Sequence, residues 1–114
     1  MITKRRPPPP DHLTDPTKRW WKAVLEDYQL EGHHLRLLQL AAEAWDRCQQ
    51  AREILATNGL THSNRFGDPV ARPEVAIERD SRLAFARLVR ELDLDVEPPA
   101  ERSRPPALRS NRRL

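Results

Sequence analysis

Apolar residues recur three or four positions apart in three separate stretches of this chain, a spacing that is typical of one face of an α-helix. In the first stretch, Asp15 is a good N-cap and Pro16 suits the first helical position. Trp20 and Val24 then begin a broad apolar face, with Trp21 about 100° further round the helix. Two interpretations of the tryptophan pair stay open: both rings belong to the core, or one docks on a neighbouring chain or stacks on a base.

The second stretch is the longest and predicts a helix over 33–58, which follows a break at Gly32 and ends at Gly59 in a C′ position. Such a helix is about 39 Å long. It exceeds the diameter expected of a globule of 114 residues, and its apolar positions form a surface wider than a single stripe. We therefore expect the chain to self-associate; the alternative is a plain helical hairpin with some exposed apolar residues.

Residues 61–72 lose the helical periodicity. Asn64 to Gly67, followed by an Asp-Pro pair, has turn chemistry that fits a short loop or a β-hairpin. The third helix is expected to begin at Pro73 and to end near residues 93–95. The predicted fold class is mainly α: a three-helix core with a long central helix, and a short loop or β-hairpin between helices two and three.

Charge and proline separate this core from two flanking segments. Residues 1–10 and 97–114 each carry a net charge of +3, and because the whole chain is also +3, residues 11–96 are net −3. Both flanks contain paired or consecutive prolines, which favour extended conformations, so we expect solvated, flexible basic tails suited to a polyanion partner. The predicted organisation is a basic Pro-rich arm over 1–12, a helical core and oligomerisation domain over 13–96, and a basic Pro- and Arg-rich tail over 97–114.

The residue pattern does not favour catalysis, a metal or a cofactor. The adjacent His33 and His34 point to different helix faces, and the order His34, Asn58, His62 separates the residues too widely for a His-Asn-His nuclease. Cys48 lies on an apolar helical face, which indicates a core residue and fits a reducing cytoplasm. The scattered glycines exclude a phosphate-binding loop, and no apolar run approaches the length of a membrane span. We expect neither an enzyme nor a membrane protein.

DNA binding through a helix-turn-helix is poorly supported. The second helix is too long for a recognition helix, and charges of both signs are expected on its exposed side: Arg36, Arg47 and Arg52 with Glu43, Asp46 and Glu53. Attraction to the phosphate backbone is better supported. The predicted phosphate contacts are Lys4, Arg5, Arg6, Lys18, Arg19, Lys22, Arg102, Arg104, Arg109, Arg112 and Arg113.

The order of these features resembles the phage terminase small-subunit family. The likeness covers about residues 13–96 and is carried by five features: Trp20-Trp21, Leu55-x-x-x-Gly59-Leu60, the loop with Gly67, Arg72-Pro73, and Arg90-Glu91-Leu92-Asp93-Leu94. The chain departs from the family pattern at Asp93, where the family often has Gly, and in its proline-rich tail.

The resemblance implies a non-catalytic DNA-packaging factor in the host cytoplasm. Such a protein forms homo-oligomers, commonly rings, binds double-stranded viral DNA near the packaging start, recruits the terminase large subunit and modulates its ATPase and nuclease. The second and third helices are expected to supply the subunit interface, through Leu37, Leu38, Leu40, Trp45, Ile54, Leu55, Phe85 and Leu88. Two other classes stay open: a small phage-encoded DNA-binding regulator that acts as a dimer, and a helical protein-interaction adaptor.

Overall fold

The computed structural model describes residues 6–94, and these form three helices and one β-hairpin. In chain order the elements are α1 (Asp15–Asp27), α2 (Gly32–Asn58), β1 (Thr61–Ser63), β2 (Pro69–Ala71) and α3 (Pro73–Glu91). The prediction of a mainly α fold with a long central helix is confirmed. The connection between helices two and three, which the sequence left as a loop or a hairpin, is an antiparallel hairpin in which His62 pairs with Val70.

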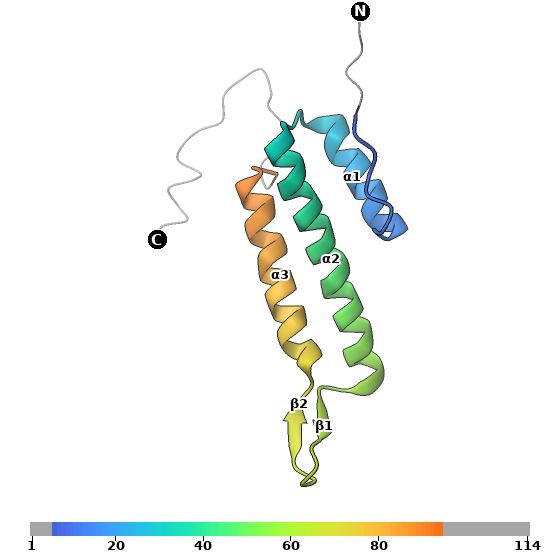
Figure 1. Cartoon of the computed structure of the whole chain (residues 1–114), viewed down its shortest axis with the longest axis vertical. Helices are drawn as coiled ribbons and strands as arrows, with labels where there is room; N and C mark the ends of the chain where they lie inside the picture. Colours follow the sequence, from blue (N-terminus) through green and yellow to red (C-terminus); the bar gives the residue numbers. More distant parts are fainter. Residues whose placement is uncertain (1–5, 95–114) are drawn as a thin grey trace, which may run out of the picture.

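The helices are arranged around α2, the long central rod. Figure 1 shows α3 running antiparallel to α2 along most of its length, α1 lying beside the first half of α2, and the hairpin extending from the opposite end. Only the α1 end is therefore three helices thick. Among residues 6–94, only α3 is packed along the far half of α2.

The core lies at the three-helix end. Trp21 is 3% exposed, and it packs with buried residues from α1, from α2, from the segment before α1 and from the residue that caps the end of α3. This cluster consists of Leu13, Trp21, Val24, Leu25, Leu38, Ala42 and Leu92. Trp20 is only partly buried and contacts the core from its edge, so the two rings of the tryptophan pair have different environments.

The start of α1 differs from the sequence prediction, because Thr14, not Asp15, is the N-cap residue. The backbone N–H and the hydroxyl of Thr14 donate to Asp46 at 2.9 and 2.8 Å, and the hydroxyl of Thr17 donates to the same carboxylate at 2.5 Å. Asp46 is 8% exposed. The expectation that it lies on the exposed side of the second helix is wrong, since these three donors and the positive end of α1 stabilise a buried carboxylate.

The proline segment before α1 is packed against the helices in its described part. The indole Nε1–H of Trp21 donates to the carbonyl oxygen of Pro7 at 3.0 Å, and Leu13 is buried in the core. Pro9 and Pro10 are half-buried. The expectation of a solvated arm is therefore wrong for Pro9 and Pro10, which are half-buried, whereas Pro7 and Pro8 are exposed and Pro7 is held through its carbonyl.

The end of α3 forms a Schellman motif. The N–H of Leu94 donates to the carbonyl of Val89 at 2.9 Å, and the N–H of Asp93 donates to that of Arg90 at 3.0 Å. This geometry places Asp93 at φ 60°, in the left-handed region that favours glycine. The aspartate also puts a negative charge at the negative end of the helix dipole. Asp93 is thus an unfavourable residue at this position on two physical grounds.

Replacing Asp93 by Gly is therefore expected to raise the free energy of unfolding by about 1 kcal/mol. Urea denaturation followed by circular dichroism measures the change. Asp93→Ala is the matched control, since it removes the charge but keeps a Cβ in the left-handed conformation. Equal effects of the two substitutions would show that backbone strain at residue 93 is negligible.

Candidate nucleic-acid interface

Three of the predicted phosphate-binding residues form one basic patch on the outer side of α1. Lys22 lies four residues after Lys18 and three after Arg19, so it neighbours both of these consecutive residues on the helix surface. Arg19 and Lys22 are exposed, and Lys18 is half-buried. Within residues 6–94, none of the three makes an ion pair. These cations are therefore available to an external anion.

The patch has a fixed position because α1 is held on two sides. Trp21, Val24 and Leu25 are buried on its inner face. Its first turn is bound to Asp46 of α2 through the side chains of Thr14 and Thr17. Because α1 is already fixed in this way, its backbone does not have to be ordered when an anion binds to the outer cations.

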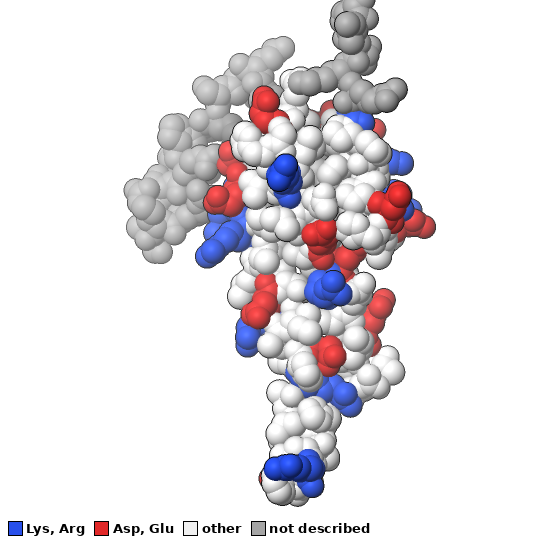
Figure 2. All heavy atoms as spheres, in the orientation of Figure 1, with Lys and Arg blue, Asp and Glu red and all other residues white. Residues whose placement is uncertain are grey.

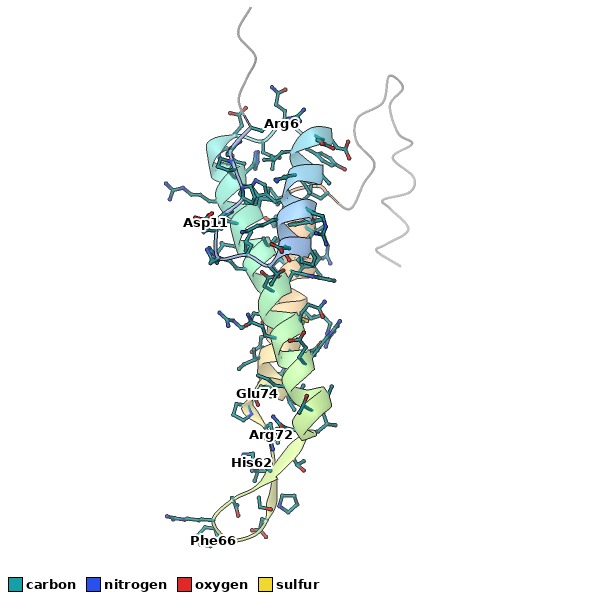
Figure 3. All side chains as sticks on the ribbon, turned by 90° about the vertical axis from the view of Figure 1, so that its right-hand side faces the viewer. Arg6, Asp11, His62, Phe66, Arg72 and Glu74 are labelled. Carbon is teal, nitrogen blue, oxygen red and sulfur yellow. The ribbon has the colours of Figure 1, made fainter. Side chains whose placement is uncertain are left out.

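Arg6 has different surroundings from the α1 patch. It lines a hollow of about 700 Å³ at the turn between α1 and α2, together with the acidic residues Glu26, Asp27 and Glu31. Figure 3 places it at the end of the molecule opposite the hairpin. The carboxylates that line the same hollow lower the positive potential at Arg6. Arg6 is therefore not part of the basic patch on α1. The other predicted phosphate contacts, Lys4, Arg5, Arg102, Arg104, Arg109, Arg112 and Arg113, lie outside the described residues.

Three arginines of α2 and α3, Arg52, Arg79 and Arg82, are paired with carboxylates. The carboxylate of Glu78 accepts from Arg52 Nε at 3.0 Å and from Arg82 Nε at 3.3 Å, and so ties the two helices together. The hydrogen bond from Arg52 is the main cause that lowers the pKa of Glu78. Figure 2 shows charges of both signs interspersed over the face in view, which agrees with a solvated mixed-charge surface. This surface is a poor match for a phosphate backbone.

The pairing of Glu78 predicts a loss of stability in acid. Because its pKa is lowered in the folded state, its stabilising contribution is complete above the unfolded-state pKa and disappears as the pH falls through the folded-state value. Between about pH 6 and about pH 3, the wild-type chain should lose more unfolding free energy than Glu78→Gln, which cannot titrate there. Urea unfolding midpoints measured across this range test the difference; parallel curves for the two chains would contradict it.

Cys48 lies beside this ion-pair cluster. It is 2% exposed, and its thiol donates to Glu78 at 3.6 Å. Burial is the largest cause that raises its pKa, with the Glu78 carboxylate acting in the same direction. The thiol therefore stays protonated at neutral pH. This is typical of a buried core cysteine, whereas a nucleophilic cysteine has a lowered pKa.

The tip of the hairpin is an exposed feature that the sequence did not single out. Phe66 is 73% exposed, and the Arg65 guanidinium lies 4.9 Å from the centre of its ring. The side-chain oxygen of Asn64 accepts from the N–H groups of Phe66 and Asp68, which fixes the turn. Figure 3 shows Phe66 at the extreme end of the molecule. The turn residues predicted the hairpin, but exposure of the ring follows only from its projection beyond the helices.

The residues predicted for a subunit interface have three different environments. Leu40, Trp45 and Ile54 are exposed on α2, at 51%, 40% and 38%. Leu37, Leu55, Phe85 and Leu88 are half-buried. Leu38 is completely buried in the chain's own core, so in this conformation it has no surface to offer a second copy. The sequence analysis missed Leu83, which is 55% exposed on α3.

The described part of the chain defines a class of protein: a small helical protein with a basic patch on an anchored helix and exposed apolar side chains along α2 and α3. In residues 6–94, no group of His, Cys, Asp and Glu side chains is placed to hold a metal ion. None of the helices described here combines the length and the apolarity needed to cross a bilayer.

Comparison with known families then narrows the class. The family model described as phage terminase, small subunit, matches residues 18–110, and the chain belongs to this family. Membership indicates a role in phage DNA packaging. No curated protein and no solved structure matches the chain in the other two comparisons.

Proposed function

We propose that this chain is the non-catalytic, DNA-binding component of a phage packaging machine. The observation that carries the proposal is the basic patch of Lys18, Arg19 and Lys22 on a protein of the terminase small-subunit family, because these anchored cations have no acidic partner among residues 6–94. Cations of this kind attract the DNA backbone without reading its sequence. The basic segments outside the described residues add to the same attraction.

Self-association is the second part of the proposal. Within the described residues 6–94, the far half of α2 is packed on α3 alone, and Leu40, Ile54 and Leu83 are exposed on the rod. A second copy would remove this apolar surface from water. In a ring, several basic patches act on one DNA molecule as linked sites, so that weak single contacts add up to firm binding.

The oligomer predicts a native mass of several copies of the chain. The double substitution Leu40→Lys/Ile54→Lys is expected to lower the number of copies, because it places two charges on the surface to be buried. Thr57→Lys, an exposed position on the same helix, is the control. Native mass spectrometry distinguishes the outcomes. A wild-type dimer would favour a DNA-binding regulator, and a monomer at high concentration would contradict the assembly proposal.

The packaging role itself is tested with the terminase large subunit. The chain is proposed to recruit that subunit and to modulate its ATPase and nuclease. The measurement is the rate of ATP hydrolysis by the purified large subunit with DNA, with and without this chain. We expect a clear change of rate that depends on DNA. An unchanged rate would favour an adaptor or a regulator that acts without a motor.

A further inference from the structure

An apolar cleft lies where α1, α2 and α3 meet. It has a volume of about 300 Å³ and is lined by Pro16, Thr17, Trp20, Trp45 and Phe85. The centre of the Phe85 ring is 5.7 Å from that of Trp20 and 5.1 Å from that of Trp45. Three aromatic rings from three different helices thus form the walls of one open cleft, and Trp45 is 40% exposed to solvent.

Two of the residues that line the cleft are tryptophans, whose indole N–H groups are hydrogen-bond donors. Within residues 6–94, the indole N–H groups of Trp20 and Trp45 have no acceptor, whereas the indole N–H of Trp21 donates to the carbonyl of Pro7. Trp21 lies next to Trp20 on α1 and about 100° round the helix. On one side of α1, the Trp21 indole thus binds the proline segment that precedes the helix. On another side of α1, the Trp20 indole lines the open aromatic cleft.

Aromatic walls with an indole donor are the chemistry that recognises polyproline II segments. Proline rings stack on the aromatic surfaces, and the carbonyls, which have no internal hydrogen bonds in this conformation, accept from the indole N–H. The rigid proline segment loses little conformational entropy on binding. The class of ligand that fits the cleft is thus a short proline-rich segment.

The chain supplies such a segment beyond its described residues. Leu94 is nine residues after Phe85, so the end of the described chain is about 14 Å further along the helix axis than the cleft. Pro105 follows Leu94 by eleven residues, which span up to about 36 Å when extended. The pair Pro105-Pro106 can therefore return to the cleft with length to spare. Pro98 follows Leu94 by only four residues, which span about 13 Å when extended. This length is too short for the chain to turn back after α3 and reach the cleft.

We infer that the cleft of Trp20, Trp45 and Phe85 is a polyproline-binding site, and that its occupant is the Pro105-Pro106 segment of the same chain. The inference requires neither DNA nor the large subunit. Its failure is therefore independent of a failure of the packaging role.

Fluorine NMR of the full-length chain labelled with fluorotryptophan tests the inference. The three tryptophan resonances are assigned with single Trp→Phe variants. In Pro105→Ala/Pro106→Ala, we expect the resonances of Trp20 and Trp45 to shift by more than their line widths, because both rings lose their ligand. The Trp21 resonance should stay in place and serve as an internal check that the core is intact.

Pro98→Ala/Pro99→Ala is the matched control, because it removes the same number of prolines from the pair that lacks the reach. Unchanged Trp20 and Trp45 resonances in the Pro105 variant, or equal shifts in both variants, would overturn the inference. Excess unlabelled wild-type chain is then added to the labelled Pro105 variant. Recovery of the wild-type resonances would identify the tail of a second copy as the occupant and would overturn the intrachain assignment.

Discussion

Replacing Asp46 by Ala is expected to lower the free energy of unfolding by about 3 kcal/mol. The substitution removes a buried carboxylate and leaves three donors of Thr14 and Thr17 without their acceptor. The effect should be concentrated at α1, since these bonds fix the start of that helix on α2. Urea denaturation gives the total loss, and hydrogen exchange of the α1 amides shows where it occurs.

Glu43→Ala is the control for this prediction. Glu43 lies three residues before Asp46 on the same helix, and its bond to His12 at 2.7 Å lies on the exposed surface. An exposed pair of this kind contributes less than about 1 kcal/mol. If Asp46→Ala and Glu43→Ala proved equally mild, the buried network would not be what holds α1.

The second large effect concerns DNA. The triple substitution Lys18→Gln/Arg19→Gln/Lys22→Gln is expected to reduce the log–log slope of affinity against salt by about 2.7, because each phosphate contact contributes about 0.9. At low salt the affinity should fall on the order of 100-fold. Fluorescence anisotropy with labelled duplex DNA over a range of salt concentrations measures both quantities.

Arg87→Gln/Arg90→Gln provides the comparison, since these exposed cations lie on α3, away from the patch. Their removal should leave the slope nearly unchanged. A triple variant with the wild-type slope would assign DNA binding to the basic segments outside residues 6–94. Circular dichroism of each variant checks that the helices remain folded.

The helical framework could be predicted because its signals are local. Pro73 at the start of α3 and Gly59 at the end of α2, where φ is 86°, are residues whose own backbone preferences match the positions they occupy. The turn residues from Asn64 to Gly67 likewise specified a reversal of the chain, and only its strand pairing was left open. The preference for Gly at the position of Asp93 is explained by its positive φ.

The candidate site was only partly predictable. The spacing of Lys22 from Lys18 and Arg19 placed these cations together, since a helix brings residues three and four apart onto one surface. Arg6 has the same charge, but the fold places it beside carboxylates at the far end of α1. Charge can be counted along a sequence, whereas the potential at a cation depends on which residues the fold brings near it.

The sequence by itself thus determined three helices, with a long amphipathic helix in the centre, and a reversal of the chain between the last two. Only the tertiary structure decided that Asp46 is buried, that Pro7 is bound by Trp21, and that Trp20 lines an open cleft. The physical reason is the range of the interactions. Helix periodicity and capping act within a few residues, whereas the donors that make a buried carboxylate stable come from another helix, 29 and 32 positions away.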